Sequence, residues 1–104
     1  MNVVDNRLIS TLETLAQEYV TGVRMNEGVQ LDVLGALNAA LAEVGDRWRG
    51  SDQIPKGIAR ILLELSSAVD SSAYLYEQPT RDEIIQISSS LLEQSVDILA
   101  DPEC

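Results

Sequence analysis

Apolar residues recur along the chain at intervals of three and four, and this spacing is repeated in four consecutive segments. Such spacing places side chains on one face of an α-helix, where they can pack against a shared core. The stripes are Leu8, Leu12, Leu15, Tyr19 and Val23; Leu34, Leu37, Leu41, Val44 and Trp48; Ile58, Leu62, Leu65, Val69 and Tyr76; and Ile84, Ile87, Leu91 and Ile98. The pattern predicts helices over about residues 5–24, 29–49, 55–77 and 80–100.

Residues that start or stop helices separate these segments. Asp5 is a candidate cap for the first helix, and Gly28 suits the turn that ends it. Proline is tolerated in the first turn of a helix, so we expect Pro55 to open the third. Thr80 and Glu83 have the spacing of a capping box, which predicts the start of the fourth helix.

Four helices of this length, joined by short loops, favour an all-α fold, an antiparallel up-down-up-down four-helix bundle. The 104 residues suit one domain, 1–104, with a core that needs no metal or disulfide. No apolar run approaches the ~20 residues of a membrane span, and the first twenty residues lack the features of a secretory signal. We therefore expect a cytoplasmic protein that does not bind membranes.

Acidic residues outnumber basic ones, and the excess lies in the second half of the chain. The whole chain holds 17 acidic and 7 basic residues, a net charge of −10. Residues 61–104 hold nine acidic residues and one basic residue, Arg81, a net charge of −8. A negative field repels phosphate backbones, so nucleic acid is excluded as the main partner, whereas a basic protein partner would be attracted.

The residue types needed for most catalytic centres are missing. The chain has no histidine, which excludes histidine-based triads, histidine-ligated zinc or haem, and the Glu-x-x-His pairs of di-iron bundles. The single cysteine, Cys104, can close no intrachain disulfide, and the glycines form no phosphate-binding loop. We expect no enzyme activity, no catalytic residues, no cofactor and no metal site.

Candidate partner-binding residues come from the acidic half of the chain. The acidic candidates are Asp70, Glu77, Glu93 and Asp97. Asp70 lies in a serine-rich stretch, with Ser66 and Tyr74 one turn away on either side as candidate hydrogen-bond partners. The nearby Ser88-Ser89-Ser90 run favours close packing of the third and fourth helices.

Two further groups of candidates adjoin apolar residues. A second apolar stripe on the fourth helix consists of Ile85, Leu92, Val96 and Leu99, which makes the apolar face wider than a one-sided helix needs. That stripe either meets another chain or lies in the centre of the bundle. Arg47 and Arg49 flank Trp48, a composition found at binding hot spots, although the register of Trp48 places it in the core.

Two classes of function fit these observations. The first is a non-catalytic protein-binding module, of the immunity, antitoxin, inhibitor or adaptor type, whose acidic helical surface masks a basic protein. The second is a homodimer or larger homo-oligomer with a structural role, joined through the wide face of the fourth helix. In size, acidity and helicity the chain is similar to small bacteriocin immunity proteins, an analogy that no specific motif supports.

Overall fold

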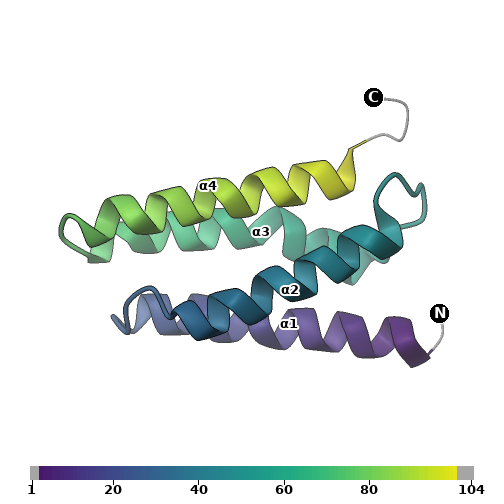
Figure 1. Cartoon of the computed structure of the whole chain (residues 1–104), viewed down its shortest axis with the longest axis horizontal. Coiled ribbons are helices and arrows are strands. Elements are labelled where there is room, and N and C mark those ends of the chain that lie inside the picture. The colour runs from purple at the N-terminus through teal and green to yellow at the C-terminus, as the bar shows by residue number, and fades with distance from the viewer. Residues whose placement is uncertain (1–2, 101–104) are drawn as a thin grey trace.

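The computed structural model describes residues 3–100, which form four α-helices of alternating direction (Figure 1). These helices are α1 (Val3–Arg24), α2 (Leu31–Trp48), α3 (Lys56–Ser72) and α4 (Thr80–Leu99), and a 3₁₀ turn, η1 (Ala73–Leu75), extends α3. The up-down-up-down bundle predicted from the sequence is confirmed. Within the described residues, none of the helices is long and apolar enough to cross a membrane.

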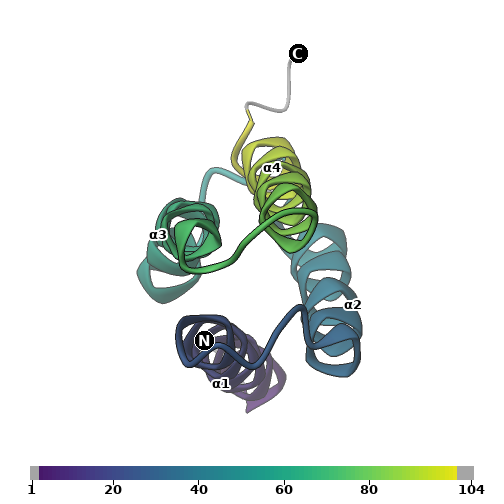
Figure 2. The same cartoon turned by 90° about the vertical axis from the view of Figure 1, so that its left-hand side faces the viewer.

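The helices pack as two antiparallel hairpins, α1 with α2 and α3 with α4. The hairpins are joined mainly through α1 and α3, which run in the same direction. α2 and α3 lie diagonally across the bundle although they are consecutive in the chain (Figure 2). The slighter contact between α2 and α4 includes a hydrogen bond from Gln94 Nε2 to Asn38 Oδ1 of 3.2 Å. Among the described helices, α3 and α4 make the most extensive contact with each other.

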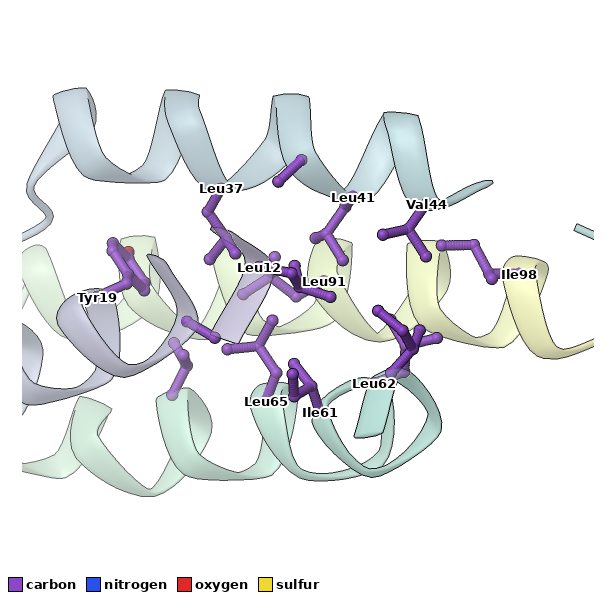
Figure 3. Close-up of a cluster of buried hydrophobic side chains, with 14 of the residues drawn as sticks. Leu12, Tyr19, Leu37, Leu41, Val44, Ile61, Leu62, Leu65, Leu91 and Ile98 are labelled. Carbon is purple, nitrogen blue, oxygen red and sulfur yellow. The ribbon is translucent and has the colours of Figure 1, made fainter. Parts of the chain in front are cut away.

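The core is built from the predicted stripes of all four helices (Figure 3). Leu12, Leu37, Ile58 and Ile84 are fully buried, one from each helix. Trp48 is only 7% exposed, which confirms the prediction that it belongs to the core. Burying side chains of this size contributes about 1.5 to 3 kcal/mol each, so this shared core is the main source of stability.

Two predicted helix caps are wrong. α1 begins at Val3, so Asp5 lies within its first turn, and its carboxylate pairs with Arg47 of α2. Thr80 is the first helical residue of α4 and makes no capping hydrogen bond. Gln78 takes this role: its Oε1 accepts from the Asp82 backbone N–H at 3.1 Å, and its Nε2 donates to Asp82 Oδ1 at 3.0 Å.

The third helix is shorter than the predicted range 55–77, because Tyr76 turns out of the helix. Ser71 and Ser72 donate their hydroxyls to the carbonyl oxygens of Ser67 and Ala68, a pattern that weakens helices. Tyr76 is extended, and its hydroxyl donates to Val23 O at 2.7 Å and accepts from Gly28 N–H at 3.0 Å. The segment after α3 thus fixes the turn between α1 and α2.

Small residues in α2 allow close approach at one point. A Cβ atom added to Gly45 would lie 3.5 Å from Ile98 Cγ1 and 2.6 Å from Arg49 Nη2. Gly35, in contrast, faces open space. Close packing of α2 against α4 therefore occurs at the C-terminal end of α2.

Tyr19 places its hydroxyl oxygen in the core. Its side chain is 0% exposed, and within the described residues its hydroxyl makes no hydrogen bond. Burial, together with nearby Tyr76 and Glu83, raises the pKa of Tyr19 from 10.0 to about 12. A neutral phenol is therefore strongly preferred in the folded state.

This pKa shift predicts a loss of stability in strong alkali. Below pH 10 the Tyr19 phenol is protonated whether the chain is folded or unfolded, so the contribution is fully present. Between about pH 10 and 12 the unfolded chain loses the proton while the folded chain keeps it, so stability falls by about 2 to 3 kcal/mol. Tyr19→Phe should remove this fall in stability between pH 10 and 12. Urea denaturation of both chains from pH 8 to 12 measures it, and parallel profiles would contradict the assignment.

Candidate protein-binding surface

The outer face of α3 and α4 exposes four large apolar side chains, which we call the apolar patch. These are Leu63 at 70%, Leu92 at 51%, Val96 at 57% and Leu99 at 37% exposure. Leu92, Val96 and Leu99 follow helical spacing and share one side of α4. Along α4 these exposed residues alternate with core residues, such as Leu91 and Ile98, that are almost fully buried. The patch is thus a second apolar stripe outside the core.

The register of the two helices places Leu63 beside this stripe. The Ser88 hydroxyl of α4 lies 3.3 Å from Asp70 Oδ1 of α3, which fixes one point where the helices are level. Because α3 and α4 are antiparallel, Leu63, seven residues before Asp70, is level with Val96, eight residues after Ser88. The apolar patch is therefore continuous across the two helices.

A polar hollow of about 350 Å³ continues from the patch along the same face. Its lining residues are Ser66, Ser67, Asp70, Ser88, Ser89 and Leu92. Ser66 and Ser88 are buried between the helices, as expected for small residues that allow close packing. The patch and this hollow together form one surface, which we call the outer groove.

Asp70 keeps acceptor capacity in the outer groove. The single Ser88 hydroxyl proton is shared between Asp70 and the Ile85 carbonyl oxygen, which is nearer at 2.8 Å. No hydrogen bond joins Asp70 to Ser66 or Tyr74, the partners expected from the sequence. Tyr74 is instead covered by Arg81, whose guanidinium carbon lies 5.6 Å from the ring centroid. Asp70 thus presents an exposed carboxylate to any molecule in the groove.

Acidic side chains without ion pairs border the groove. Glu93 follows Leu92 on α4 and is exposed, and within residues 3–100 neither Glu93 nor Asp70 forms an ion pair. Glu77 is exposed in the connection between η1 and α4. The surface therefore combines exposed apolar area with uncompensated negative charge.

The remaining candidates lie elsewhere and make internal contacts. Arg49 Nε is 2.7 Å from Asp97 Oδ2, so this pair joins the end of α2 to α4. Arg47 pairs with Asp5 and lies over the Trp48 ring, 5.9 Å from its centroid. The structure thus brings Asp70, Leu92, Val96 and Glu93 to one face and separates Arg47 and Arg49 from them.

A second groove, between α1 and α3, has a lining with balanced charge. Its volume is about 340 Å³, and its apolar lining includes Ala16, Ile61 and Leu65, which are already buried. Arg60 crosses its rim toward Glu13, with 3.9 Å between Nη2 and Oε2. Glu13 and Glu64 in its lining are balanced by Arg24 and Arg60, so this groove has less charge with which to attract a basic partner.

Sequence reasoning missed Leu63 as part of the surface. Leu63 is offset from the core stripe of Ile58, Leu62 and Leu65, which is a usable signal of exposure. Its position beside Val96 could not be read from the sequence, because it depends on the register of α3 against α4.

No family model, no curated protein and no solved structure matches the chain. Within residues 3–100, no three carboxylate, histidine or cysteine side chains gather in a group that could hold a metal ion.

Proposed function

We propose that the chain is a non-catalytic protein-binding module that uses its outer groove to mask a basic region of another protein. The observation that carries the proposal is the apolar patch, which lies outside the core and is bordered by acidic residues without ion pairs. Contiguous exposed apolar side chains with a polar rim are typical of interaction surfaces. An immunity, antitoxin, inhibitor or adaptor protein would use such a surface, and a cytoplasmic location is part of the same proposal.

The charge distribution supports electrostatic steering of the partner. Seven acidic residues of the segment 61–100 are exposed, and Arg81 is the only basic residue in that segment. A surface of one sign raises the rate of encounter with an oppositely charged partner, and salt screens this effect. The apolar patch would then supply the close contacts that keep the complex together.

Capture of a partner from the native host tests this proposal. We expect that purified wild-type chain binds a basic protein and releases more of it as salt rises. Once that protein is isolated, Glu93→Lys should slow association several-fold, while Glu43→Lys, an exposed control on α2, should change it little. Asp97 is left unchanged because it pairs with Arg49. Equal association rates for both variants, independent of salt, would contradict the proposal.

The exposed Leu92 and Val96 also favour the second candidate, a homo-oligomeric structural bundle. Two copies joined through the outer groove would bring two acidic surfaces together. This repulsion weakens self-association, so we expect light scattering to give the monomer mass at low salt. A dimer mass that falls to monomer after polar substitution of Leu92 and Val96 would establish the oligomer instead.

A further inference from the structure

We propose that the occupant of the outer groove is a basic amphipathic helix that lies along α3 and α4. This inference rests on the proposed function and adds the form of the partner segment. Its basis is the arrangement of three features on one face: the apolar patch, the exposed Asp70 carboxylate in the hollow, and the acidic border at Glu93.

The apolar patch has a length that suits the binding of a helix. Leu92, Val96 and Leu99 extend over about 10 Å of α4 at 1.5 Å per residue, and Leu63 adds a contact from α3. A partner helix offers apolar side chains at positions i, i+3 or i+4, and i+7, which cover the same distance. A partner strand lacks a place to pair, because residues 3–100 contain helices and turns but no strand edge.

The polar end of the groove specifies the charge of this helix. Ser88, which is hydrogen-bonded to Asp70, lies one helical turn before Leu92, so the carboxylate is about 6 Å beyond the apolar patch along α4. A lysine or arginine one to two turns beyond the apolar stripe of the partner would reach Asp70. A further basic residue on the flank next to α4 would face Glu93. Acidic helices are repelled by the same groups.

Other occupants fit the charges less well. A second copy of this chain would present acidic groups to the acidic groove. Membrane surfaces with anionic lipids carry negative potential and would repel the same face. Only a partner that is both apolar and basic on one helix satisfies the patch and the border together.

Synthetic peptides of about 16 residues, which cover about 24 Å as a helix, provide the test. The first carries a leucine stripe at helical spacing with lysines on both flanks and one turn beyond the stripe. The second has every lysine replaced by glutamate. The third has the composition of the first in an order that destroys the stripe. Fluorescence anisotropy with the full chain measures affinity, and backbone amide NMR shifts locate the contact.

We expect saturable binding of the first peptide only, with the largest shifts on α3 and α4. Leu92→Asp combined with Val96→Asp should weaken binding at least about 30-fold, as loss of a hot-spot contact does. Asp70→Asn should weaken it about 2- to 5-fold and reduce its salt dependence. Leu31→Asp is the control, because Leu31 is also an exposed apolar residue, at 70%, but lies on α2. This change should leave the affinity for the peptide unaltered.

Three results would overturn the inference. These are equal affinity for the scrambled basic peptide, equal loss of affinity in Leu31→Asp and the patch variant, and shifts centred on α1 or α2. The proposed function fails separately, if the protein captured from the host also binds the Leu92→Asp, Val96→Asp chain with unchanged affinity. Patch-dependent capture of a protein, combined with no binding of the basic helical peptide, would reject the helical partner alone.

Discussion

Leu91→Ala will lower the free energy of unfolding by about 2 to 5 kcal/mol, whereas Leu92→Ala will change it by less than about 1 kcal/mol. The two leucines are neighbours on α4, but Leu91 is 1% exposed and Leu92 is 51% exposed. Truncation of Leu91 removes contacts in the core and leaves a cavity, while truncation of Leu92 removes side-chain atoms that face mainly solvent.

Thermal and urea unfolding, followed by circular dichroism, measure the stability of both variants. A loss of about 3 kcal/mol corresponds to a fall in Tm of at least about 10 °C for a domain of this size. Similar losses for both variants would show that Leu92 belongs to the core. The apolar patch would then have a structural explanation and would no longer require a partner.

Tyr76→Phe will lower the free energy of unfolding by about 1 to 3 kcal/mol, because it removes two hydrogen bonds at a buried position. The Tyr76 hydroxyl donates to Val23 O and accepts from Gly28 N–H, and the ring is 8% exposed. Without the hydroxyl, the Val23 carbonyl loses this donor and the turn after α1 loses its link to the end of α3.

Tyr74→Phe is the control for this change, because Tyr74 is 65% exposed and only two residues away. We expect its stability to stay within about 0.5 kcal/mol of the wild type. In Tyr76→Phe, amide hydrogen exchange should also quicken for Gly28 and the turn around it. Stability equal to the wild type in Tyr76→Phe would show that the two hydrogen bonds are replaced by water without net cost.

The helices could be predicted from the sequence because their apolar stripes are regular. Leu12, Leu37, Ile58 and Ile84 lie in the core as their spacing indicates. Helix ends were less predictable, since they depend on single polar groups. Gln78 rather than Thr80 bonds to the first turn of α4, a contact that was not predicted from the sequence.

The arrangement of the helices could not be read from loop lengths. The loop between α2 and α3 is short, yet these helices lie across the diagonal of the bundle (Figure 2). Their placement follows from how α1 packs against both α2 and α3. A stripe pattern defines the face that is buried but leaves open which neighbour covers it.

The candidate surface was predicted in part. The sequence indicated an acidic second half and a second apolar stripe that includes Leu92 and Val96. The structure shows both residues exposed, and Leu92 lines the same hollow as Asp70. Arg47 and Arg49 were candidates because they flank Trp48. Their ion pairs with Asp5 and Asp97 depend on contacts between helices, which no local pattern contains.

Site-specific photocrosslinking in the native host tests most directly whether the outer groove is the binding surface. A photoreactive amino acid replaces Leu92 in one chain and Leu31, the exposed leucine on α2, in another. We predict a covalent adduct with a basic protein from position 92 and none from position 31. Adducts from position 31 alone, or the same adducts from both positions, would contradict the account.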